Sequence, residues 1–128
     1  MDAAVRDWMK VLTAYAEDWD ETFRKDRGLY FTQEYWYLFT ECVRADADGE
    51  PLTRQEAMRR MRVSFSEDAK VDRIDRAVDD GWLVQDKSRS DLRVHLLLPT
   101  DKLRKAMNEH LVRTLNEARR VLGTTLAQ

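Results

Sequence analysis

The stretch from residue 53 to residue 98 constrains the fold more than any other part of the chain. Two short helical patterns are followed by Gly81, and then by two apolar runs, Trp82-Leu83-Val84 and Val94-His95-Leu96-Leu97-Leu98, around a charged tip at Lys87-Ser88-Arg89-Ser90-Asp91. A helix pair followed by a hairpin is the order of a winged helix-turn-helix, whose second helix enters a DNA groove. We therefore expect this stretch to form a DNA-binding lobe.

The residues at the starts of these two helices mark where they begin. Thr53 and Glu56 have the S/T-x-x-E form of a capping box, and that helix is expected to run to about Arg60 or Met61. Ser64 and Ser66 are alternative caps for the next helix, and Gly81 suits the left-handed conformation that ends it. The residues that this helix is expected to bury are Val71, Ile74 and Val78.

Long amphipathic helices are expected at both ends of the chain. The first spans residues 3–25 and is ended by Gly28, and the last follows Pro99-Thr100. Each is longer than about 20 residues, or roughly 30 Å, which exceeds what a core of this size can cover, so a homodimer is expected to bury them. The first apolar stripe contains Val5, Trp8, Met9, Leu12, Tyr15, Ala16, Trp19 and Phe23, and the last contains Leu103, Met107, Leu111, Leu115, Ala118, Val121, Leu122 and Leu126.

A second helix is expected from an N-cap at Thr32 to Ala45, followed by a loop over residues 46–51. The sequence therefore predicts a mostly α fold with a small β-hairpin, in one winged-helix domain of residues 1–128. Residues 1–27 and 100–128 are the expected dimerisation helices, and residues 30–98 are the expected DNA-binding lobe. The inward side of the second helix is expected to carry Tyr35, Leu38, Phe39, Cys42 and Val43.

From about Tyr30 to Leu98, the order of elements resembles the MarR family of bacterial transcription regulators. Asp80-Gly81-Trp82-Leu83-Val84 resembles the family's turn out of the recognition helix, and Ser88-Arg89-Ser90-Asp91-Leu92-Arg93 resembles its D-x-R-D-x-R wing signature. Asp91 and Arg93 match that signature, whereas serines replace its first Asp and its wing Arg. Leu98-Pro99-Thr100-Asp101-Lys102 follows the family's L-T-x-x-G pattern loosely and lacks the glycine.

The resemblance implies a homodimeric repressor that binds a pseudo-palindromic operator and is relieved by a small aromatic ligand. Such a ligand would bind between the dimer helices and the DNA-binding lobe. The candidate pocket residues are Trp8, Trp19, Tyr35, Trp36 and Phe39, although aromatic residues at helical spacing are also ordinary core residues. Cys42 is either an oxidant sensor, as in some members of that family, or a small buried apolar residue.

The helix that ends at Gly81 carries the residues expected to meet double-stranded DNA. Arginine pairs with guanine in bidentate fashion, so Arg73 and then Arg76 are expected to read bases from the side opposite the core, with most acidic residues turned to one flank. Ser66 is expected to contact a phosphate and Ala69 a thymine methyl group. Further phosphate contacts are expected from Arg54, Arg59, Lys70 and Lys87, and a minor-groove contact from Arg89.

The acidic residues leave a second interpretation open. Six carboxylates lie between Glu67 and Asp80, and residues 1–52 carry 12 acidic and 6 basic groups. Carboxylates repel phosphates unless they point away from them, so the same pattern fits a winged helix that docks proteins and no longer binds DNA.

Other functional classes lack a signal in the sequence. There is no phosphate-binding glycine loop, nucleophile motif or metal-ligand spacing around His95 or His110, so neither an enzyme nor a cofactor is predicted. A single cysteine, no basic leader before an apolar run, and no apolar run of about 20 residues predict a cytoplasmic protein that does not span a membrane.

Overall fold

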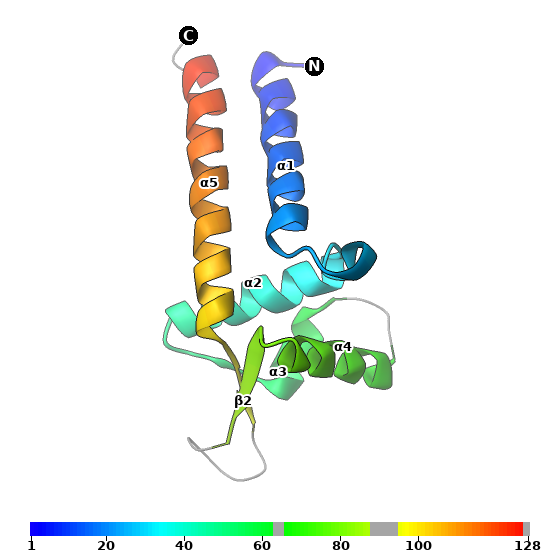
Figure 1. Cartoon of the computed structure of the whole chain (residues 1–128). Coiled ribbons are helices and arrows are strands. Elements are labelled where there is room, and N and C mark those ends of the chain that lie inside the picture. The colour runs from blue at the N-terminus through cyan, green and yellow to red at the C-terminus, as the bar shows by residue number, and fades with distance from the viewer. Residues whose placement is uncertain (63–65, 88–94, 127–128) are drawn as a thin grey trace. The chain divides into compact units, whose positions relative to one another are not determined.

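The computed structural model describes residues 1–62, 66–87 and 95–126, with side chains as far as Gly123. Its helices and strands follow one another as the sequence predicts, with two short additions (Figure 1). The chain forms two compact units, of which the first comprises Met1–Phe31 with Asn108–Gln128 and the second comprises Thr32–Met107. The fold is mostly helical, with a small antiparallel sheet in the second unit.

In the first unit, α1 (Ala3–Thr22) begins where Asp2 accepts a hydrogen bond from the Ala4 amide at 2.7 Å. It ends three residues before the predicted boundary of residue 25, and a 3-10 turn, η1 (Asp26–Gly28), follows it. Asp26 and Arg27 adopt positive φ values of 38° and 23°, which a right-handed helix does not allow. The helix therefore stops before Gly28 rather than at it.

Only part of the predicted stripe of α1 is buried. Trp19, Phe23 and the unpredicted Val11 are buried, and the Trp19 indole donates a hydrogen bond to the Tyr30 carbonyl at 2.9 Å. By contrast, the side chains nearer the N-terminus are 46–49% exposed. These exposed residues are Val5, Trp8, Met9 and Leu12.

The last helix, α5 (Asp101–Leu126), buries part of its predicted apolar stripe within the chain itself. Leu103 and Met107 are buried as expected, but His110 and Thr114 continue the buried face, whereas Leu111 and Leu115 are 41% and 49% exposed. At about 100° per residue, the four buried positions fall within about 60° of one another, and the predicted row of leucines drifts away from them. Beyond Met107, His110 and Thr114 therefore take the inner side of α5, while Leu111 and Leu115 lie on the surface that the predicted homodimer would bury.

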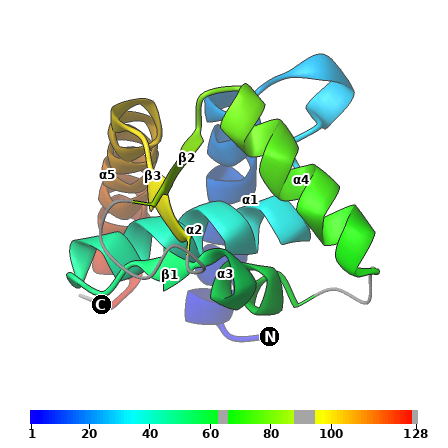
Figure 2. The ribbon, with the colours of Figure 1, turned by 90° about the horizontal axis from the view of Figure 1, so that it is seen from below.

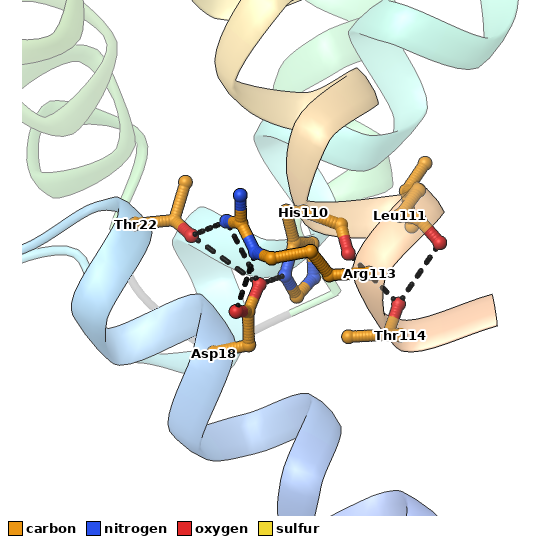
Figure 3. Close-up of polar contacts among 6 residues, drawn as sticks. All are labelled: Asp18, Thr22, His110, Leu111, Arg113 and Thr114. Carbon is orange, nitrogen blue, oxygen red and sulfur yellow. Dashed lines mark hydrogen bonds and ion pairs between the residues drawn. The ribbon is translucent and has the colours of Figure 1, made fainter. Parts of the chain in front are cut away.

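A polar network joins α1 to α5 in the first unit (Figure 3). His110 Nδ1 lies 2.6 Å from Asp18 Oδ2, and the Arg113 guanidinium contacts both Asp18 oxygens at 2.8 and 3.2 Å. Burial opposes ionisation of Asp18, but the hydrogen bonds from Arg113 and His110 outweigh it and lower the pKa of this carboxyl group. Burial also lowers the pKa of His110, against the opposing effect of Asp18.

We expect this network to make stability depend on pH. The fold lowers the pKa of His110 below its ordinary value of 6.5, so its contribution is complete above that pH and is lost as the pH falls through it. Asp18 adds a loss only in more acidic solution, because its ordinary pKa is 3.8. Urea denaturation should therefore show a lower free energy of unfolding at about pH 5.5 than at about pH 7.5. His110→Gln should reduce this difference in the free energy of unfolding. An equally large difference in the variant would contradict the assignment of the pH dependence to His110.

The second unit begins with α2 (Gln33–Ala47), and Thr32 caps it by accepting a hydrogen bond from the Tyr35 amide at 3.3 Å. The predicted capping box of α3 (Arg54–Arg60) is confirmed, since Thr53 Oγ1 accepts from the Glu56 amide and the Thr53 amide donates to Glu56 Oε1. Ser66, rather than Ser64, caps α4 (Glu67–Asp79). Ser64 lies outside the described residues.

A three-stranded sheet lies beside α2 and α4 in this unit (Figure 2). Its strands are β1 (Leu52–Thr53), β2 (Leu83–Asp86) and β3 (Leu96–Pro99), and β3 pairs antiparallel with both others. The sequence predicts only the β2–β3 hairpin, because a two-residue strand is too short to show alternation. The observed strands also extend two residues beyond Val84 and one residue beyond Leu98.

Gly81 ends α4 as predicted, with φ +81°. The Gly81 amide donates to the Val78 carbonyl at 3.0 Å, and the Trp82 amide donates to the Ala77 carbonyl at 2.9 Å. These two bonds form a Schellman motif, which turns the chain from α4 into β2.

Gly81→Ala should destabilise the protein by about 1 kcal/mol, because a Cβ atom disfavours the left-handed conformation. Nothing lies within 4 Å of a Cβ atom built there, so the cost is conformational. Gly123→Ala is the matched control, since Gly123 lies in α5 with equally open surroundings and should gain about 0.5–1 kcal/mol from helix propensity. Chemical denaturation measures both changes, and equal effects at the two positions would contradict the turn assignment.

Candidate nucleic-acid interface

The position of α4 is fixed by a small set of contacts within the second unit. Ile74 and Ala77 are fully buried, and Val71 and Val78 are half-buried beside them. The Tyr35 hydroxyl of α2 donates a hydrogen bond to the Arg73 carbonyl at 3.0 Å. Burial raises the pKa of this hydroxyl to about 12, so it stays protonated and continues to donate.

The exposed face of α4 differs from the predicted one. Ala77 lies about 60° around the helix from Ile74, on the side of Arg73, and thereby turns Arg73 toward the core. The sequence assigned Arg73 to the side opposite the core, and that placement was wrong, because Arg73 is half-buried beside Ala77. The exposed residues of α4 are Glu67, Asp68, Asp72, Asp75, Arg76 and Asp79.

Arg73 is engaged by α2. Its Nε lies 3.3 Å from Glu34 Oε1, and one terminal nitrogen donates to the Ala69 carbonyl at 3.1 Å. The side chains of Arg73 and Glu34 are 30% and 14% exposed. The guanidinium group is therefore drawn back along α4 instead of extending into solvent.

Two other predicted DNA contacts also carry acidic partners. Arg54 binds Asp75 at 2.8 Å, which links α3 to α4, and Arg76 Nε lies 3.4 Å from Asp80. Neutralised cations attract phosphates less strongly, and a cation that must first leave a carboxylate gives up that interaction.

The remaining cations are better placed for phosphates. Within residues 1–62, 66–87 and 95–126, no carboxylate forms an ion pair with Arg59, Lys70 or Lys87. Arg59 and Lys87 are exposed and Lys70 is half-exposed. Ser66 Oγ accepts from the Ala69 amide at 3.2 Å and so acts as a cap. The predicted minor-groove residue, Arg89, lies outside the described residues.

The aromatic residues predicted for a ligand pocket are divided between core and surface. Trp19, Tyr35 and Phe39 are buried, whereas Trp8 is 47% exposed and Trp36 is half-buried. Cys42 is also buried, and burial raises the pKa of its thiol to about 12. A thiol with this pKa has little reactive thiolate at neutral pH, which favours the apolar interpretation over oxidant sensing.

A cavity of about 480 Å³ that the sequence did not predict lies between α3, α4 and the residue before β3. Met58 and Val71 contribute apolar surface, and Arg54, Glu67 and His95 contribute polar groups. Its volume is in the range of small-molecule sites. Its lining comes from three separated segments, so only the folded arrangement reveals it.

The described part of the chain lacks two further features. No group of three or more His, Cys, Asp or Glu side chains there has the arrangement of a metal site. No helix in that part is both long and apolar enough to cross a membrane.

The order α3-α4-β2-β3, with β1 paired to β3, defines a winged helix-turn-helix. The fold matches the crystal structure of Sco3205, a MarR family transcriptional regulator from Streptomyces coelicolor, in complex with DNA. The match has a TM-score of 0.55 and 16% sequence identity, and it covers 93% of this chain and 71% of that chain. The predicted MarR-like fold is thereby confirmed. No protein-family model matches the chain, and no curated protein matches it in sequence.

Proposed function

We propose that the chain is a non-enzymatic, DNA-binding transcription regulator that represses as a cytoplasmic homodimer on a pseudo-palindromic operator. The observation that carries this proposal is the fold match over 93% of the chain to a regulator bound to DNA. In a winged helix-turn-helix, the second helix of the pair enters the major groove, and here that helix is α4.

The proposed contacts follow from the available cations. Phosphates are bound by Arg59, Lys70 and Lys87. At the start of α4, the Ser66 hydroxyl group donates a hydrogen bond to a further phosphate. Arg73 reads a base, which requires it to leave Glu34. Further proposed contacts come from Ala69, Arg54, Arg76 and Arg89.

Removing a free cation should weaken binding to all DNA sequences about equally. We expect Lys87→Ala and Arg59→Ala each to lower the slope of log affinity against log salt by about one, because each loses one phosphate contact. Lys105→Ala, an exposed position on α5, is the charge-matched control and should leave the slope unchanged. Fluorescence anisotropy with a labelled duplex over a salt series measures this. Equal slopes for all variants would contradict the assigned contacts.

The proposed dimer explains the exposed apolar residues of the first unit. Val5, Trp8, Met9 and Leu12 on α1 and Leu111 and Leu115 on α5 are 41–49% exposed. Side chains of this size gathered on two long helices are unfavourable in water, and a second copy of the chain would cover them.

Leu12→Lys and Leu115→Lys should therefore convert the dimer to a monomer, because each places a charge in an apolar interface. Val84→Lys, at an exposed apolar position in β2, is the control that should leave the dimer intact. Sedimentation equilibrium measures the mass of each. A monomeric wild-type protein, or a dimer unaffected by either substitution, would contradict the proposed interface.

A protein-docking module is the second candidate, and the acidic exposed face of α4 favours it. Four aspartates on the helix that should face DNA oppose phosphates, whereas they would attract a basic protein surface. For this candidate, duplex binding that depends on salt should be absent, and a protein partner should persist after nuclease treatment. A small aromatic effector belongs to the regulator proposal only, where it would act by shifting the population of DNA-competent dimers.

A further inference from the structure

Two consecutive residues of α2 hold the same residue of α4. The Tyr35 hydroxyl binds the Arg73 carbonyl at 3.0 Å, and the Glu34 carboxylate lies 3.3 Å from the Arg73 side-chain Nε. The backbone and the side chain of Arg73 are therefore both held by α2. The bond from Arg73 to the Ala69 carbonyl adds a third restraint along α4 itself.

We propose that Glu34 is an intramolecular competitor of DNA, which restrains DNA affinity by occupying the guanidinium group of Arg73. This inference rests on the proposed function. The Glu34 carboxylate carries the same charge as a phosphate oxygen and accepts the same hydrogen bonds, so Arg73 cannot serve both at full strength.

The burial of Glu34 makes the competition costly for DNA. The Glu34 side chain is 14% exposed, so a departing guanidinium group would leave a carboxylate that water solvates poorly. The Asp80 side chain is equally buried, at 12% exposed, but its pair with Arg76 is the weaker restraint, because Arg76 is 48% exposed and the pair lies within one helix at 3.4 Å. Glu34 is thus the acidic residue whose removal should change DNA binding most.

The test is a binding series with a labelled random-sequence duplex, measured by anisotropy at several salt concentrations. Glu34→Gln keeps the size and an acceptor oxygen of the side chain and removes its charge. We expect it to tighten binding at low salt by about tenfold and to steepen the salt slope by about one, because on a random-sequence duplex, which does not offer the base that Arg73 would read, the released guanidinium group pairs with a phosphate. Asp46→Asn is the matched control, since Asp46 lies at the other end of α2, pairs with Arg104 at 3.0 Å and carries the same charge.

The double variant Glu34→Gln/Arg73→Ala separates the named contact from general electrostatics. If the gain passes through Arg73, the double variant binds no more tightly than Arg73→Ala alone. The inference is overturned if the gain persists without Arg73, if Asp46→Asn gives the same gain, or if Glu34→Gln weakens binding. If the wild-type protein binds DNA but the single and double variants do not show these differences, this inference alone is refuted. If neither the wild-type protein nor any variant shows salt-sensitive binding, the proposed function is refuted as well.

Discussion

The packing of Ile74 and Ala77 into the core of the second unit decides what this protein presents to a partner. These two positions set the rotation of α4 about its axis, and every other side chain of the helix follows from that rotation. With Ala77 inward, Arg73 is drawn toward α2 and aspartates occupy the outer face. The sequence had instead predicted a buried side centred on Val71, Ile74 and Val78. That rotation would have turned both Arg73 and Arg76 outward.

The cations predicted to contact DNA fall into two groups in the described part of the chain. Arg54, Arg73 and Arg76 already have acidic partners, while Arg59, Lys70 and Lys87 have no ion-pair partner in the described part of the chain. Free cations confer affinity for any phosphate backbone, whereas a paired arginine contributes only when a DNA partner outcompetes its carboxylate. In the proposed regulator, the acidic residues would therefore weaken binding to arbitrary DNA.

Local signals predicted the ends of several elements well. Thr32, the Thr53–Glu56 capping box and Gly81 act through hydrogen bonds to residues within about four positions, so their roles can be read from adjacent sequence. The errors arose where distant residues decide the outcome. Alanine carries little hydrophobic signal, so the burial of Ala77 was missed, and the buried His110 depends on Asp18, which lies 92 positions away in the chain. Likewise, the Glu34–Arg73 pair joins residues 39 positions apart, and no spacing rule predicts such a contact.

The most direct test of the central claim, that α4 of a homodimer engages operator DNA, is selection of bound fragments from a random duplex library by the wild-type protein. A homodimer that places two copies of α4 in DNA should enrich an inverted repeat whose half-site centres lie about 34 Å, or one helical turn, apart. Recovery of no enriched sequence at any salt concentration would contradict this claim and would leave the acidic face of α4 as a protein-docking surface.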